Sequence, residues 1–177
     1  MRISKTFALV AAFLLAFSIT AFAKWDADLV NKSDATVKTF KQADKGLKSF
    51  FEQAYGYAVF PNIGKGGLGV GGARGTGVVY KDGKPTGKAT MTQLSIGFQA
   101  GGQAFSQIIF FQNQKAYDDF IGTNYEFSAQ ASAVAIKEGV AAQSSYSNGV
   151  AIFTHVKGGL MYEASIGGQR FRFKAKK

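Results

Sequence analysis

The spacing of apolar positions along this chain changes near residue 55. Between residues 30 and 54 they recur three or four residues apart, which predicts one amphipathic helix that begins near Asp26 or Asp28. Beyond Tyr55 the period falls to two, as in strands that bury one face. The apolar positions of the predicted helix are Val30, Val37, Phe40, Ala43, Leu47, Phe50, Phe51 and Ala54. The pattern therefore predicts a helical head and a β-rich body.

Turns and one short helix divide the β-rich body. Lys81-Asp82-Gly83-Lys84 has the composition of a hairpin turn. Apolar and polar residues alternate over 94–101, beginning with apolar Leu94, which predicts a half-buried strand. The continuous apolar run within 103–111 predicts a strand in the centre of the sheet. Asn113 as N-cap and Gly122 as C-terminal stop predict a short helix between them.

The rest of the body predicts further strands. Residues 125–140 are ambiguous and favour a strand, and residues 149–155 and 160–173 have the pattern of a closing hairpin. No linker or low-complexity run interrupts the chain, so we expect one domain over 24–177. The predicted fold class is α+β: a glycine-rich, strongly curved, mostly antiparallel sheet packed with an N-terminal amphipathic helix and a short helix near 113–122.

Glycine is concentrated between Tyr57 and Tyr80. Glycine inside a strand costs backbone entropy, so we expect close backbone approach there, either between strands or to a ligand. Gly67, Gly69 and Gly72 form a GxGxxG string, but strand-like residues follow it where a dinucleotide site requires a helix. The string therefore does not indicate a nucleotide site.

A four-residue glycine spacing, as at Gly67, Gly71 and Gly75, also suits close-packed membrane helices. Lys65 and Arg74 flank this segment, and no uninterrupted apolar run of about 18 residues follows residue 23. The spacing therefore favours a curved sheet over a channel, which stays a minor alternative.

The first 23 residues have the pattern of a secretory signal. Arg2 and Lys5 precede an apolar run, and Ala21-Phe22-Ala23 is a small-x-small cleavage site. We expect cleavage near Ala23 and export to the periplasm or the medium, the alternative being an uncleaved anchor. The chain has no cysteine, which excludes disulfides and lipid attachment to a cysteine.

The chain is strongly basic. It carries 21 Lys and Arg against 11 Asp and Glu, a formal charge of +10, which favours an anionic partner such as phospholipid, nucleic acid or an acidic polymer. Four lysines fall on an arc of roughly 80° of the predicted helix, either as a solvated face or as a surface for lipid headgroups. The candidate lipid-binding cations are Lys38, Lys41, Lys45, Lys48, Lys65, Arg74, Arg170 and Arg172, and the candidate interfacial aromatics are Trp25, Phe50 and Phe51.

Residues able to perform covalent chemistry are scarce. His155 is the single histidine and lies in a strand-like run, where a structural or surface role is expected. Without cysteine it cannot form a Cys/His pair or a histidine-rich metal site, and no GxSxG motif supports a serine nucleophile. Asp118 and Asp119 are adjacent on a predicted helix and diverge. The sequence predicts no catalytic residues, no metal and no cofactor.

Several segments, in order, resemble the SYLF domain family. The resemblance covers almost all of residues 24–177 and implies a lipid-binding module. Eukaryotic members of the family bind phosphoinositides and are associated with actin at membranes, and bacterial relatives are exported single domains. The matching segments are 57–61 with the glycines that follow, 94–103, 109–111 leading to 116–120, Ser145-Tyr146-Ser147, 149–153 and Lys157-Gly158-Gly159-Leu160.

Taken together, these patterns predict an exported, non-enzymatic protein that binds anionic phospholipid or a membrane surface. Binding is expected to use basic residues and interfacial aromatics, although no family motif specifies the lipid-binding residues. Export separates the chain from cytosolic actin and makes nucleic acid an unexpected partner. The alternatives are an envelope or stress protein that acts by self-association, and a nucleic-acid-binding protein. The sequence specifies neither the oligomeric state nor the lipid.

Overall fold

The computed structural model describes residues 26–176 apart from 98–102, 123, 129–130 and 158–162. The predicted signal and Trp25 lie outside the described residues. The described elements are α2 (Ala27–Ala43), α3 (Leu47–Gln53), β1 (Gly56–Lys81), β2 (Lys84–Gly97), β3 (Gln103–Phe111), α4 (Gln114–Ile121), β4 (Tyr125–Glu126), β5 (Ser132–Ala135), the 3₁₀ turn η1 (Ala141–Gln143), β6 (Val150–Val156), β7 (Glu163–Ser165) and β8 (Arg170–Ala175).

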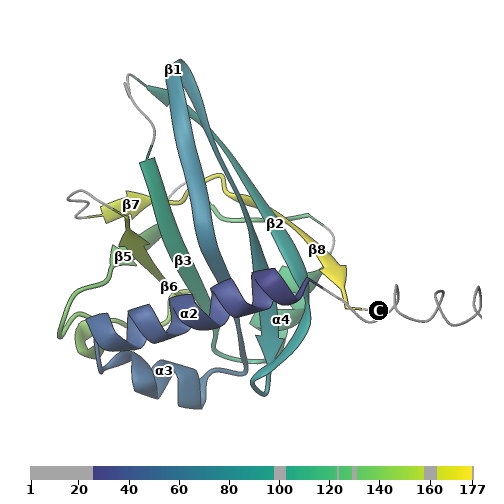
Figure 1. The fold of residues 1–177 in the computed structure, drawn as a ribbon, viewed down its shortest axis with the longest axis vertical. Coiled ribbons are helices and arrows are strands. Elements are labelled where there is room, and N and C mark those ends of the chain that lie inside the picture. The colour runs from purple at the N-terminus through teal and green to yellow at the C-terminus, as the bar shows by residue number, and fades with distance from the viewer. Residues whose placement is uncertain (1–25, 98–102, 123, 129–130, 158–162, 177) are drawn as a thin grey trace, which may run out of the picture.

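The strands form one strongly curled sheet. Its order is β4-β8-β2-β1-β3-β6-β5-β7, and every pair is antiparallel except β5 with β6. The curl brings Phe171 of β8 to Phe60 of β1, with ring centroids 5.6 Å apart, although β2 lies between these two strands. Helix α2 lies across the lower part of the sheet (Figure 1). The predicted α+β class with a curved, mostly antiparallel sheet is confirmed.

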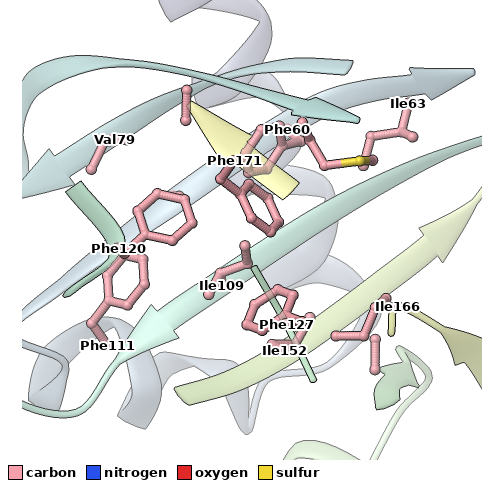
Figure 2. Packing of buried hydrophobic residues seen from close by; sticks show 14 of the residues in the cluster. Phe60, Ile63, Val79, Ile109, Phe111, Phe120, Phe127, Ile152, Ile166 and Phe171 are labelled. Carbon is pink, nitrogen blue, oxygen red and sulfur yellow. The ribbon is translucent and has the colours of Figure 1, made fainter. Parts of the chain in front are cut away.

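Both faces of the central strands are buried. On the concave face Phe60, Ile109 and Phe171 meet Phe120 of α4 (Figure 2). On the convex face α2 and α3 cover a second layer, which contains Phe40, Leu47, Phe50, Val59, Val78, Ile108, Phe110 and Phe153. Successive residues of β3 enter alternate layers, which explains its continuous apolar run. The prediction of a central strand at 103–111 is confirmed.

The single helix expected over 30–54 is wrong, because Asp44 divides it into α2 and α3. Asp44 is 3% exposed, and its carboxylate accepts hydrogen bonds from the backbone N–H of Gly46 (2.8 Å) and of Ala141 (2.7 Å). Burial raises the pKa of this carboxyl, but backbone N–H groups of Ala141, Gly46, Gly139 and Val140 outweigh burial and hold the pKa below its usual value. The buried carboxylate therefore fastens the helix pair to the loop before η1.

The predicted turn and the short helix are both confirmed. Asp82 and Gly83 join β1 to β2 with φ angles of 50° and 70°, which suits the right-handed twist of the two strands. At the start of α4, Asn113 Oδ1 accepts a hydrogen bond of 3.0 Å from the backbone N–H of Ala116. Gly122 is the C-terminal cap, as expected.

The predicted closing hairpin is wrong. Strand β6 pairs with β3 and β5, β7 pairs with β5, and β8 pairs with β2. Strands β7 and β8 therefore lie toward opposite edges of the sheet (Figure 1), and residues 166–169 cross between them. In place of the single strand favoured over 125–140, the structure has two short strands. Strand β4 is the first in the strand order, and β5 is the next to last.

Two crossing segments therefore meet on the concave side of the sheet: residues 127–128 and 131, which lie between β4 and β5 in the chain, and residues 166–169, which lie between β7 and β8. They hydrogen-bond to each other: Phe127 N donates to Gln169 O at 3.0 Å, and Gly168 N donates to Phe127 O at 3.1 Å. Gln169 also exchanges two side-chain hydrogen bonds with Gln107 of β3, and both glutamines are fully buried. The reciprocal amide bonds satisfy polar groups that would be costly to bury alone.

Some glycines of β1 lie directly against neighbouring backbone and side chains, whereas others face open space. A Cβ added at Gly77 would lie 2.4 Å from Val59 O and 2.8 Å from the Phe60 ring. A Cβ at Gly64 would meet nothing within 4 Å. The expected close backbone approach is therefore confirmed at Gly77, where the part of β1 that contains Gly77 lies against the part that contains Val59 and Phe60.

We expect Gly77→Ala to destabilise the protein by about 1–3 kcal/mol, because the added methyl overlaps backbone and a buried ring. The matched control Gly64→Ala should change the free energy of unfolding by no more than about 0.5 kcal/mol. Urea unfolding followed by circular dichroism measures both. Equal effects of the two substitutions would contradict the packing role assigned to Gly77.

We expect Asp44→Asn to lower the free energy of unfolding by about 1–3 kcal/mol at neutral pH, because an amide replaces an acceptor-only carboxylate. The folded-state pKa of Asp44 is depressed, so its contribution is present above the unfolded pKa of about 3.9 and is lost as the pH falls through the folded value. The difference between wild type and variant should therefore shrink below about pH 4. Urea unfolding from pH 7 to 3 tests this, with exposed Asp118→Asn as control.

Candidate functional site

Three arginines from strands far apart in the sequence line one groove on the convex face. The sheet register places Arg74 of β1 opposite Thr92 of β2, and Thr92 opposite Arg170 of β8. Arg172 lies opposite Thr90, two residues along the same strands, and so shares this face. The cavity is about 580 Å³ and its lining residues are Arg74, Thr90, Thr92, Asn124, Glu126, Arg170, Phe171 and Arg172. We call this cavity the arginine groove.

The alternation of β8 explains the direction of its arginines. Phe171, between Arg170 and Arg172, is 2% exposed and belongs to the concave core. Because successive side chains of a strand point to opposite faces, the buried phenylalanine turns both arginines outward. On β1, Val78 packs beneath the helices, and Arg74 lies four residues away on the same face.

One of the three arginines is already paired. Arg170 Nε donates to Glu126 Oε2 at 2.9 Å, and both side chains are substantially exposed. Arg74 and Arg172 form no ion pair with any described residue and are exposed. A guanidinium presents a planar fork of N–H donors that fits a phosphate or carboxylate in bidentate fashion. The groove can therefore bind an anion, and the threonine hydroxyls can add hydrogen bonds.

The lysines predicted on the helical head lie elsewhere and do not converge. Lys41 Nζ lies 4.4 Å from the centre of the Phe51 ring, and Lys48 pairs with Glu52 at 3.7 Å. Lys38 and Lys45 are exposed and make no ion pair among the described residues. These four exposed positions are spread over α2, α3 and the turn between them.

Lys65 does not join the arginine groove. It is half-buried on β1, where it pairs in register with Gln103. Lys65 lies two residues from Ile63 of the concave layer, whereas Arg74 is adjacent to Ala73 of that layer, so the two cations lie on opposite faces. Of the eight predicted cations, the structure therefore brings together Arg74, Arg170 and Arg172.

The described aromatic candidates belong to the protein interior. Phe50 is 8% exposed and packs edge-on against Phe153 at 5.1 Å, so the expectation that it contacts an interface is wrong for this fold. Phe51 is half-buried, with its ring 4.8 Å from that of Phe110 and 5.2 Å from that of Tyr57. The spacing of Phe50 and Phe51 in the sequence therefore marks the side of the helix that packs on the sheet, and not a surface for lipid.

The exposed apolar side chain near the groove is Leu94, which is 84% exposed. Leu94 was expected on the buried side of a strand. It lies two residues from Thr92 and so faces the same side as the arginine groove. Its register partner is Gly72, which offers no side chain, and β8 pairs with β2 only as far as Thr92. The hairpin of β1 and β2 projects beyond its neighbours there (Figure 1).

Other features that could support chemistry are sparse in the described part of the chain. The His155 ring lies 6.0 Å from that of buried Phe40, in keeping with a structural or surface position. Within the described ranges, no three His, Cys, Asp or Glu residues come close enough to hold a metal ion. Among the described helices, none combines the length and apolar character needed to span a bilayer.

Two comparisons with known proteins agree with the resemblance noted from the sequence. The profile of the family described as "Ysc84: Las17-binding protein actin regulator" matches residues 92–177. A curated protein of Aeromonas veronii, "Beta cell expansion factor A", is 31% identical over 140 residues, which cover 77% of this chain and 52% of that protein.

These matches show that the chain belongs to the Ysc84, or SYLF, family, which is associated with lipid and actin binding. The profile match includes β8 and the part of β2 that carries Thr92, and so contains Arg170 and Arg172. The chain spans about half the length of the curated relative that it matches.

Proposed function

We propose that this protein is exported and binds anionic phospholipid at a membrane surface, without catalysing a reaction. The observation that carries the proposal is the arginine groove with Leu94 on the same face of the sheet. Cations that meet headgroup phosphates beside an apolar side chain that enters the interface are the two components of peripheral membrane binding. Membership of a family associated with lipid supports the proposal.

The expected strength is that of reversible binding. Each Arg or Lys near an anionic surface contributes about 1 kcal/mol, so the three arginines supply roughly 3 kcal/mol. Transfer of an exposed leucine out of water adds about 1.5–3 kcal/mol. Glu126 opposes the first contribution, because its carboxylate lies in the same groove and already neutralises Arg170.

Export bears on the choice of partner. A secreted protein meets envelope or extracellular membranes and does not meet the actin of its own cytosol, so lipid rather than actin is the proposed partner. The name of the Aeromonas veronii relative describes an effect on beta cells for that protein. The proposal for this chain rests on membrane lipid alone.

We expect sedimentation with vesicles to increase with their phosphatidylglycerol content and to decrease as salt rises from 0.05 to about 0.5 M. The double substitution Arg74→Gln with Arg172→Gln should weaken binding about 30-fold, which corresponds to about 2 kcal/mol. Lys38→Gln with Lys45→Gln removes the same charge from α2 and the turn that follows it, and is the matched control, expected to weaken binding less than about threefold. Glu126→Gln should strengthen binding.

Other results would overturn this proposal. Equal binding to neutral vesicles at high salt would rule out the charge mechanism. Equal losses in the two double variants would show diffuse attraction instead of a defined groove. Inorganic phosphate added as competitor distinguishes the sources of the anion: release from vesicles at millimolar phosphate would indicate a site for free phosphate rather than for a membrane.

A further inference from the structure

A second cavity, of about 490 Å³, adjoins Phe127 and Ile152 of the concave layer. It is surrounded by Phe127, Ser128 and Ala131 of the first crossing segment, by strands β5 and β6, and by the 145–148 loop. Its apolar lining includes Tyr125, Phe127, Val134, Val150 and Ile152, and serines from β5 and the two loops form much of the rest. None of its lining residues carries a charge. We call this cavity the serine-rimmed pocket.

The floor of the serine-rimmed pocket is part of the core. Phe127 is 4% exposed and Ile152 is 7% exposed, and both belong to the concave cluster (Figure 2). The Tyr125 ring packs edge-on against Phe127 at 5.3 Å. A cavity of 300–1,000 Å³ with apolar and aromatic walls and a few polar groups is typical of small-ligand sites. Its lining suits an uncharged, flexible, apolar group.

The serine-rimmed pocket and the arginine groove are separated by one edge strand. Strand β4 consists of Tyr125 and Glu126 and is the first strand in the sheet order. Its two side chains point to opposite faces, so Glu126 lines the groove and Tyr125 lines the pocket. The residues on either side continue the alternation: Asn124 lines the groove and Phe127 the pocket. Neighbouring residues of a strand only two residues long thus line the two cavities.

We propose that the serine-rimmed pocket holds the alkyl chain of a single phosphate-bearing amphiphile whose headgroup lies in the arginine groove. The inference rests on the proposed function and extends it, because it makes the protein a binder of one lipid molecule as well as of a surface. The lining favours this occupant: the groove is cationic and suits phosphate, whereas the adjacent pocket is uncharged and suits a hydrocarbon. A purely electrostatic contact with a membrane would leave the pocket unused.

The test uses three soluble probes below their critical micelle concentrations, with isothermal titration calorimetry and native mass spectrometry of the purified protein. Lysophosphatidic acid with a 14-carbon chain carries head and chain, glycerol 3-phosphate carries the head, and a monoacylglycerol of equal length carries the chain. Lysophosphatidic acid should bind one per protein and more than about 100-fold tighter than glycerol 3-phosphate, because chain burial adds affinity. Arg74→Gln should weaken both phosphate-bearing probes.

A bulky side chain in the pocket should remove the gain from the chain and leave the headgroup site intact. Ser132 of β5 lines the pocket and is exposed, so Ser132→Trp fills space without replacing a buried residue. It should reduce lysophosphatidic acid affinity to within about threefold of glycerol 3-phosphate. Ser49→Trp on α3 is the matched control and should change neither affinity. Ser128→Trp serves as a second blocking variant if thermal unfolding shows that Ser132→Trp is misfolded.

The results separate this inference from the proposed function. If lysophosphatidic acid binds no tighter than glycerol 3-phosphate while vesicles still bind, the pocket is not a chain site and surface binding stands. Affinity for the monoacylglycerol equal to that for lysophosphatidic acid, and insensitive to Arg74→Gln, would disconnect the pocket from the groove and overturn the inference. Loss of all vesicle binding would overturn the proposed function itself.

Discussion

Closure of the curled sheet by its two crossing segments is the constraint on which the other features depend. The described residues of these segments, 127–128 with 131 and 166–169, bond to each other, and the buried Gln107–Gln169 amide pair anchors them to β3. Each of these buried amides satisfies the other, so the pair favours one alignment of the crossing.

Both cavities follow from this closure. The 166–169 crossing leads into β8, which places Arg170 and Arg172 beside Arg74, and Phe127, Ser128 and Ala131 form one wall of the serine-rimmed pocket. The helical head covers part of the convex face, where Asp44 fastens α2 and α3 to the start of η1. The convex face of the sheet therefore has two parts. One is an aromatic layer buried beneath the helices, and the other is an uncovered region that carries the exposed arginines and Leu94.

The elements that could be predicted are those specified by neighbouring residues. The Asp82-Gly83 turn, the Asn113 cap and the apolar run of β3 depend on local backbone preferences or on burial of both faces, and all three are confirmed. The break at Asp44 was missed, because its carboxylate is satisfied by a backbone group at Ala141, 97 residues away. Phe50 and Leu94 were misplaced because periodicity identifies an apolar side chain without showing whether another element covers it.

By itself the sequence determined the basic charge, the family, the α+β class and the alternation that turns Arg170 and Arg172 away from Phe171, since these depend on composition or on the two-residue period of a strand. Only the tertiary structure decided which cations meet. Arg74 joins Arg170 because β2 pairs with β1 on one side and with β8 on the other, and Lys65 is excluded because it faces the opposite side of β1. Such convergence depends on strand order and register, which are set by the packing of distant segments.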